Sequence, residues 1–235
     1  MPLLHVDNMT RSFGSTQALA GAQLSIERGE IVALMGANGA GKSTLVKILS
    51  GVLPADGGTI HLDGRPFAPR SPAEAAKAGV VTVHQSTDLV GAAGLTVADA
   101  LLLNRFADRN TPFFVSRAGI RRAAQAMLDA AGFSLPLDRD FGELASADRQ
   151  LVAIARALAN RADLLILDEP TASLSGEESR RLFDILLRLR KRGLAILYIA
   201  PPIWKRSPIV RWSCAPAASS APFRGRSIFR APSRR

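Results

Sequence analysis

A glycine-rich loop at residues 36–44, with the sequence GANGAGKST, constrains the fold of this chain more than any other stretch. An apolar run at residues 31–34 precedes it and a largely apolar stretch at residues 45–49 follows it, which predicts the order strand, loop, helix. Glycines let backbone N–H groups surround a phosphate with no Cβ atom in the way, and the helix start adds its positive dipole end. The spacing G-x-x-x-x-G-K-S in this context predicts a phosphate-binding loop.

Two side chains of the loop have the chemistry that a nucleotide requires. Lys42 can reach the outer phosphates as a mobile point charge, and the hydroxyl of Ser43 suits a magnesium ion. The alternative is an ordinary glycine-rich turn, but the complete spacing and the context on both sides favour nucleotide binding. The predicted nucleotide-binding residues of the loop are Gly36, Asn38, Gly39, Ala40, Gly41, Lys42, Ser43 and Thr44.

A pair of carboxylates follows the apolar residues 164–167 and forms the second strong signal. Four apolar residues predict a buried strand, and ligands of open α/β sheets gather at the carboxyl ends of strands. Asp168 is placed to hold magnesium, directly or through water, and Glu169 to orient or deprotonate a water aimed at the terminal phosphate. An acidic strand end before a proline turn is the alternative, which the nearby phosphate loop makes the weaker one.

The pattern of the remaining chain predicts an α/β fold. Strands alternate with helices, which implies a mostly parallel sheet covered on both faces. Residues 57–64 have the order turn, strand, turn, and indicate an antiparallel β subdomain in the N-terminal part. Residues 86–161 are helical in pattern and interrupt the alternation, so we interpret them as an inserted α-helical subdomain. Three of the further expected helices have a recognisable end. One begins with a cap at Thr96, another ends at Gly132, and a third begins with a capping box at Ser175.

Charge and composition exclude several classes. Eight of the 30 basic residues and none of the 20 acidic ones lie in residues 200–235, so residues 1–199 carry 22 basic and 20 acidic residues. This nearly neutral body lacks the basic stripe of a nucleic-acid-binding protein, and no nucleic acid is expected as a partner. No apolar run approaches the roughly twenty residues of a membrane span, and the N-terminus has no secretory signal. We expect a soluble or peripheral protein. Its only cysteine, Cys214, rules out an internal disulfide and is compatible with a reducing compartment.

The motifs resemble the ATPase subunit of an ATP-binding-cassette (ABC) transporter, a P-loop NTPase, over residues 3–199. Residues 36–44 match the Walker A motif of this family, and Asp168 and Glu169 match Walker B with its catalytic glutamate. Phe13 matches the aromatic that stacks on adenine, although by itself it is equally a core aromatic. Gln85 matches the glutamine that couples the metal and attacking water to the membrane partner, although by itself it is an ordinary surface residue.

The exact residues of several motifs most resemble those of bacterial monosaccharide importers of the ribose and xylose type. That resemblance implies ATP and Mg²⁺ as cofactors, with Ser43, Gln85 and Asp168 at the metal and Glu169 as the base. It implies a membrane permease as partner, a second ABC ATPase domain bound head to tail, and a periplasmic sugar-binding protein acting indirectly. It also implies a cytoplasmic location, peripheral on the inner face of the cell membrane. Such importers commonly carry two ATPase domains in one chain, so this chain looks truncated.

Two departures from the family pattern concern hydrolysis. The signature stretch is LASADRQ at residues 144–150, and Ala145 stands where the family has the serine that reaches the partner's γ-phosphate. One lost hydrogen bond to a charged group costs about 1.5–3 kcal/mol, so ATP-driven closure is expected to weaken. We expect Ser146, Ala147 and Asp148 to face the partner's ATP. The family's switch histidine is also missing, because no histidine follows His84.

Residues 200–235 form a basic tail rich in proline, arginine and serine, which we expect to be disordered and separate from an ATPase domain at residues 1–199. Codons can be chosen for residues 200–215 so that a shifted frame encodes TADLEEIADRAVVLR. That product resembles the helix and strand which follow the switch histidine in the family. We hypothesise that a frameshift, in the gene or its reading, replaced the native C-terminus.

Three functions follow from these observations. The first is ATP binding and hydrolysis that drives sugar import, impaired by the missing histidine. The second is a nucleotide-binding module without useful turnover, either a decayed fragment or a regulatory half-site. The third, a soluble ABC ATPase acting on DNA or ribosomes, is disfavoured by the neutral body.

Overall fold

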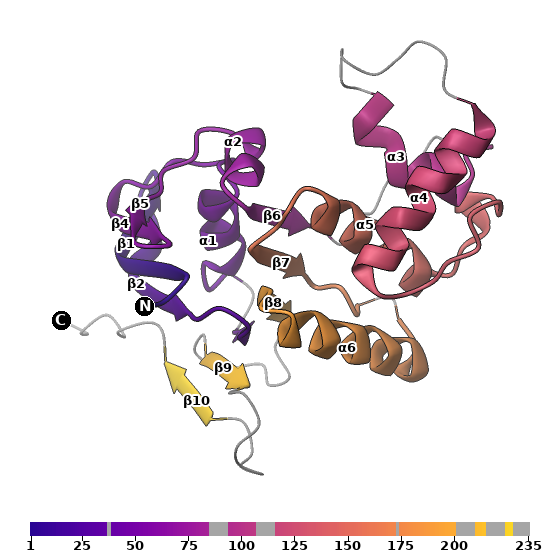
Figure 1. Cartoon of the computed structure of the whole chain (residues 1–235). Coiled ribbons are helices and arrows are strands. Elements are labelled where there is room, and N and C mark those ends of the chain that lie inside the picture. Colours follow the sequence, from indigo (N-terminus) through magenta and orange to yellow (C-terminus); the bar gives the residue numbers. More distant parts are fainter. Residues whose placement is uncertain are drawn as a thin grey trace.

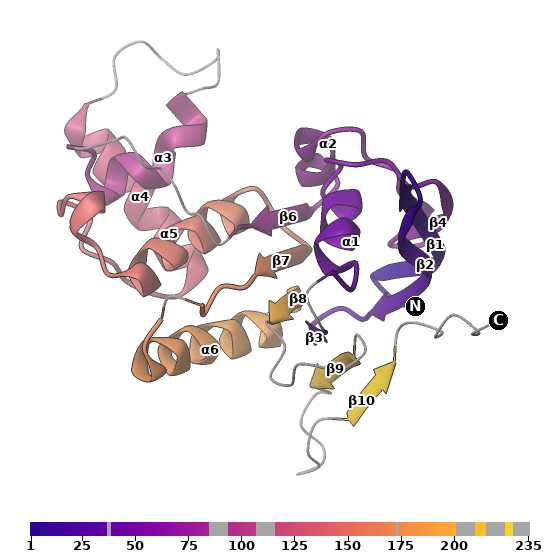
Figure 2. The same ribbon diagram turned by 180° about the vertical axis from the view of Figure 1, so that it is seen from behind.

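The computed structural model describes residues 1–36, 39–84, 94–106, 116–172, 174–200, 210–214 and 224–227 (Figure 1). An antiparallel sheet lies at one end of these residues, a group of helices lies at the other end, and a mainly parallel sheet lies between them (Figures 1 and 2). This arrangement confirms the predicted α/β fold with a parallel core, an antiparallel β part and added helices. No helix within the described ranges is long and apolar enough to cross a membrane.

The antiparallel sheet has the strand order β2-β1-β4-β5. Leu4 of β1 lies opposite Ile26 of β2 and Leu62 of β4, and all three side chains are buried. Alternate residues of these strands are apolar, which places one face of the sheet on a core. The strands are β1 Leu4–Phe13, β2 Thr16–Ile26, β4 Gly57–Leu62 and β5 Arg65–Pro66.

The central sheet has the order β10-β9-β3-β8-β7-β6, in which β3, β8, β7 and β6 run parallel. Successive residues of β7 point into two different cores: Leu165 and Leu167 pack in a cluster with α5 and α6, while Leu164 and Ile166 pack in a cluster with α1 and the antiparallel sheet. A strand buried on both faces is a run of apolar residues, as residues 164–167 are. The strands are β3 Ile31–Met35, β6 Val80–Val83, β7 Leu164–Asp168, β8 Ala195–Ala200, β9 Val210–Cys214 and β10 Arg224–Ser227.

Helices cover the parallel sheet and form a subdomain beside it. The expected caps are present: the hydroxyl of Thr96 accepts a bond from Asp99 N, Gly132 ends a helix at φ 80°, and Ser175 forms a capping box with Glu178. The helical subdomain consists of α3, α4, the short 3₁₀ helix η1 and α5. The helices are α1 Lys42–Leu49, α2 Pro72–Lys77, α3 Val97–Phe106, α4 Arg117–Ala131, η1 Phe141–Glu143, α5 Ser146–Ala159 and α6 Gly176–Lys191.

Two features differ from the sequence-based expectation. Helix α2 was not predicted, although Ser71 caps it and Pro72 occupies its first turn, because six residues are too short for a periodic pattern. The tail, predicted to be disordered, contains the strands β9 and β10 within its described residues. Strand β9 pairs antiparallel with β3, from Ile31 opposite Cys214 to Met35 opposite Val210, so it satisfies the backbone groups on the open side of β3.

Candidate nucleotide-binding site

The phosphate loop joins β3 to α1 and packs tightly against β2. Gly41 has φ 88°, and a Cβ atom there would lie 2.4 Å from the carbonyl oxygen of Ala18 and 2.8 Å from Cδ2 of Leu19. Both the backbone angle and the lack of space require glycine. Gly39 also has a positive φ, 79°. The antiparallel sheet therefore packs against the loop through β2 and fixes the position at which α1 begins.

Lys42 is the buried cation of the site. Its side chain is only 6% exposed, and its Nζ donates a hydrogen bond of 2.7 Å to the carbonyl oxygen of Gly36 at the start of the loop. Burial lowers the pKa of Lys42, while the negative charges of Glu169 and Asp168 oppose that effect. The loop thus holds an ammonium group in a partly desolvated place, where its attraction for phosphate oxygens is stronger than in water.

The two carboxylates lie at the same edge of the sheet as the loop. Asp168 at the end of β7 pairs with Ile199 of β8, and Met35 at the end of β3 pairs with Ala200. The side chain of Asp168 is 27% exposed, and its Oδ2 lies 3.6 Å from Nδ1 of His84, the residue after β6. The structure therefore brings together the two halves of the site that the sequence predicts separately.

The backbone of Glu169 adopts a conformation that is uncommon outside glycine. Its φ is 49°, and two hydrogen bonds hold it: its N–H donates to the carbonyl of Ile199 at 3.1 Å, and its carbonyl accepts from Ala172 N at 3.2 Å. A non-glycine residue with positive φ costs free energy and persists where the surroundings fix it, often at functional sites. The surroundings therefore fix the backbone of Glu169 at the position where the sequence predicts the base.

A pair of hydroxyl groups, which the sequence did not indicate, supports the same turn. Oγ1 of Thr171 lies 2.7 Å from the Tyr198 hydroxyl oxygen on β8. The Tyr198 ring packs against the Phe183 ring of α6, with 5.3 Å between the ring centroids. Burial raises the pKa of Tyr198, so the phenol stays protonated and can donate. These partners are 27 residues apart in the chain, and no local spacing indicates the contact.

Phe13 ends β1 and is 46% exposed, so it is not a core aromatic. The guanidinium of Arg11 lies over its ring, 5.1 Å from the ring centre, and also binds Asp56 at 2.5 Å. A cation above one face of the ring and solvent around the rest leave ring surface available for stacking. The ring is therefore accessible to a planar ligand.

The remaining predicted residues of the nucleotide site fall into two groups. Ser43 is exposed and Thr44 half-buried in the first turn of α1, with Ala40 half-buried in the loop. Asn38 and Gln85 lie outside the described residues, so their predicted roles rest on the sequence alone.

The signature residues begin α5 and contact α6. Ala145 is the N-cap and has no side-chain hydrogen bond, which leaves Ser146, the exposed first residue of α5, as the nearest hydroxyl. Ala147 is buried, and Asp148 binds Arg181 of α6 at 2.9 Å. The Asp148–Arg181 contact fixes the start of α5 on α6.

The residues present fit a magnesium ion of the kind that accompanies nucleotides. No group of three or more His, Cys, Asp or Glu side chains that could hold a metal occurs among the described residues. Mg²⁺ in nucleotide sites uses one or two protein oxygens together with phosphate oxygens and water, not a cage of carboxylates. The Ser43 hydroxyl and the half-buried Asp168 carboxylate are donors of that type.

A parallel sheet whose glycine loop surrounds a buried lysine, with two carboxylates at the same edge, defines a P-loop nucleotide-binding domain. The chain belongs to the ABC transporter family, which matches residues 19–172. Membership of this family of ATPases confirms the resemblance seen in the motifs and implies ATP as the nucleotide.

Proteins described as ribose import ATP-binding proteins are similar in sequence. Those of Yersinia pestis and Rubrobacter xylanophilus are 43% identical over 200 and 199 residues, and that of Corynebacterium glutamicum is 40% identical over 202. Each alignment covers 85% of this chain but only 37–39% of the relative. The chain therefore matches well under half the length of these relatives.

Solved structures of ATP-binding cassettes have the same fold. The ADP conformation of MJ1267, an ATP-binding cassette of an ABC transporter, has a TM-score of 0.73 at 28% identity and covers 87% of this chain and 83% of its own. The protein cbiO1 of Clostridium perfringens, part of the transporter complex cbiONQ, has a TM-score of 0.70 at 27% identity, covering 86% of this chain and 78% of its own.

Proposed function

We propose that this chain binds and hydrolyses ATP to drive the import of a sugar of the ribose type through a membrane permease. The observation that carries the proposal is the meeting of Lys42, Asp168 and Glu169 at one edge of the sheet. The ribose import relatives support the substrate class. Sugar recognition itself belongs to the permease and its binding protein, so the proposal assigns this chain only the energy-supplying step.

Each site residue has a defined task in the proposed reaction. Lys42 and the loop N–H groups hold the β- and γ-phosphates, and Phe13 stacks on the adenine. When bound, Mg²⁺ neutralises phosphate charge, held by Ser43, Asp168 and, on the sequence resemblance, Gln85. Glu169 accepts a hydrogen bond from the attacking water and takes its proton as the water attacks the γ-phosphorus. The breaking bond joins the γ-phosphorus to the bridging oxygen, so the products are ADP and phosphate.

The proposed partners follow from the same reaction. Two ABC domains would close head to tail, so that the start of α5 in each covers the nucleotide of the other. A membrane permease would bind this pair at the cytoplasmic face of the cell membrane, and a periplasmic sugar-binding protein would act through the permease. Nucleic acid is not among the proposed partners, because residues 1–199 are nearly neutral.

A nucleotide-binding module without useful turnover is the second candidate. The absence of a capping side chain at Ala145 favours it, as does Ala200 at the position after Ile199 where the family has its switch residues. The positioned Glu169 favours hydrolysis. Steady-state ATP turnover of the intact chain and of its Glu169→Gln variant separates the two functions, since only an enzyme loses turnover through that change.

Ser146 is proposed to supply the hydroxyl that Ala145 lacks. Replacing Ser146 by alanine is expected to weaken ATP binding and turnover by about tenfold, because a hydrogen bond to a charged group is lost. ATP affinity and turnover of Ser146→Ala measure the effect. Ser179→Ala, in α6, is the matched control and should change neither quantity. Equal behaviour of the two variants would remove Ser146 from the proposed site.

The frameshift hypothesis is tested on the gene. We expect the shifted frame across residues 200–215 to encode TADLEEIADRAVVLR, a helical stretch followed by an apolar strand. The test is to sequence the gene and its transcript. A shifted frame that encodes neither element would end the hypothesis, and the tail would then be a genuine variation of the family.

A further inference from the structure

A cavity of about 790 Å³ lies on the opposite side of the parallel sheet from the phosphate loop. Its lining includes Asp163 and Leu194, which precede β7 and β8, whereas the loop follows the end of β3. Parallel strands place their beginnings at one edge and their ends at the other, so the cavity and the nucleotide site lie at opposite edges. Its volume is in the range of small-molecule sites.

Small side chains create the space. Ala123, Ala126 and Ala130 lie on one face of α4 at spacings of three and four residues, where larger side chains would fill the cavity. The wall continues with longer apolar side chains from α3, α4, α5 and α6: Leu101, Met127, Leu158 and Leu189. An apolar wall of this kind suits a hydrocarbon body.

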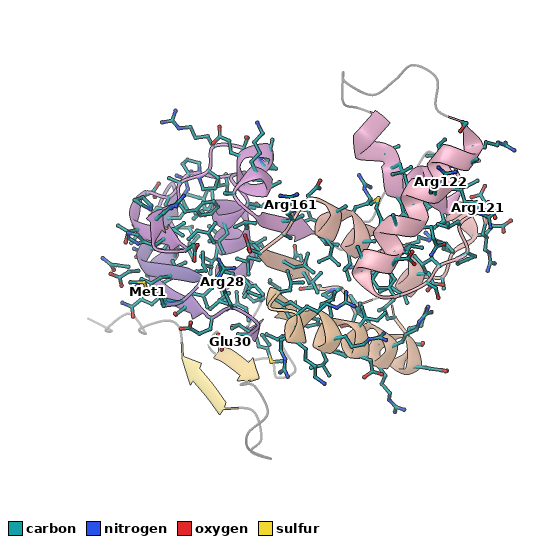
Figure 3. The ribbon with its side chains drawn as sticks, in the orientation of Figure 1. Met1, Arg28, Glu30, Arg121, Arg122 and Arg161 are labelled. Carbon is teal, nitrogen blue, oxygen red and sulfur yellow. The ribbon has the colours of Figure 1, made fainter. Side chains whose placement is uncertain are left out.

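A backbone hydrogen bond between two turns places two arginines beside the cavity. The N–H of Gly29 donates a hydrogen bond of 3.0 Å to the carbonyl of Gly193, which ties the turn before β3 to the turn before β8. Arg28 and Arg192 immediately precede these glycines, and both line the cavity. Arg28 is exposed in its turn, with 48% of its side chain accessible, and Figure 3 shows it apart from Arg121 and Arg122, which lie on α4 of the helical subdomain.

The charge of the lining is unbalanced. Arg28, Arg156 and Arg192 line the cavity with one carboxylate, Asp163, and Arg28 binds both Asp163 at 2.9 Å and Asp63, outside the lining, at 3.1 Å. Burial lowers the pKa of Arg156, so this guanidinium is partly desolvated. A net positive lining, in which the Arg156 guanidinium is partly desolvated, favours an anion over a neutral or cationic ligand.

We propose that this cavity binds a small amphipathic anion, a medium-chain alkyl carboxylate, with its chain against α4 and its head at the arginines. Such a ligand touches α3, α4 and α5 of the helical subdomain and, through Arg28 and Arg192, the core. A hydrogen bond already links the subdomain to the core there. Nη1 of Arg192 donates it, over 2.7 Å, to the carbonyl oxygen of Ala130 near the end of α4. The ligand therefore stabilises one orientation of the helical subdomain on the core.

Calorimetric titration of the chain of residues 1–235 with decanoate tests the proposal. Decanoate should bind, while decyltrimethylammonium, which has the chain without the negative charge, and propionate, which has the charge without the chain, should not. Arg156→Gln should weaken decanoate binding by about tenfold or more, through the loss of charge-assisted hydrogen bonding. Arg122→Gln, on the outer face of the same subdomain, is the matched control and should bind normally.

A second variant guards against a folding effect. Ala126→Leu fills the cavity from an exposed position and should abolish decanoate binding while its melting temperature stays near that of the unaltered chain. Equal binding of decanoate and the ammonium compound would show detergent-like adsorption and overturn the proposal. Normal binding by both Arg156→Gln and Ala126→Leu would overturn it as well. ATP affinity, measured in parallel on each variant, should equal that of the unaltered chain, because the cavity and the nucleotide site lie at opposite edges of the sheet.

Discussion

Replacing Lys42 by methionine should reduce ATP affinity by about a hundredfold and abolish turnover. The ammonium is buried in the loop beside Gly36 and faces the negative region of Asp168 and Glu169. Methionine keeps the length and the apolar stem, so the loss reports the charge. Removing a charge-assisted interaction with phosphate in a partly desolvated site corresponds to about 3 kcal/mol, which is the stated factor. Binding of a fluorescent ATP analogue and steady-state phosphate release measure the two effects.

Lys47→Met is the matched control for this experiment. Lys47 lies in the last turn of the same helix, is exposed, and carries the same charge. Its replacement removes one positive charge from α1 without touching the loop, so ATP affinity should remain within about twofold. If both variants lost ATP affinity equally, the total positive charge of α1 would explain binding, and direct contact of Lys42 with the phosphates would be ruled out.

Replacing Glu169 by glutamine should leave ATP binding intact and reduce turnover by about a hundredfold or more. The amide has the size and shape of the carboxylate but cannot accept a proton from water, and general-base catalysis is worth about 10²–10⁴-fold. The backbone that sets the side chain, held by Ile199 and Ala172, does not depend on the change. Phosphate release under saturating ATP gives the turnover, and nucleotide titration gives the binding.

Glu177→Gln provides the comparison, because Glu177 is an exposed carboxylate in the first turn of α6. It should retain full turnover. A chain with no measurable turnover before any mutation would favour the nucleotide-binding module over the enzyme. A chain whose turnover survives Glu169→Gln would place the base elsewhere.

Local patterns of the sequence predict the nucleotide site well, because each part of the site is a short motif of consecutive residues. Residues 36–44 follow one apolar strand and the acids at 168 and 169 end another, and parallel pairing of these strands with β8 then places them at one edge. The capping residues of α3, α4 and α6 are likewise local signals.

The features that the sequence did not predict depend on contacts between distant parts of the chain. The bond between Thr171 and Tyr198 and the positive φ of Glu169 both arise from packing of the turn after β7 against β8. The strands β9 and β10 were unexpected for a related reason. Composition favours disorder for the tail, whereas the open side of β3 offers backbone partners that composition cannot reveal.

The backbone bond between Glu169 and Ile199 also marks a boundary in the chain. The motif resemblance read from the sequence extends to Ile199, and the carbonyl of the same residue accepts the hydrogen bond from the backbone of the proposed base. The two hydrogen bonds that hold the backbone of Glu169 therefore both lie within residues 1–199, before the tail. Under the frameshift hypothesis, a chain that carries the shifted-frame sequence after Ile199 is expected to release phosphate faster than this chain, while the turn after β7 keeps its two hydrogen bonds.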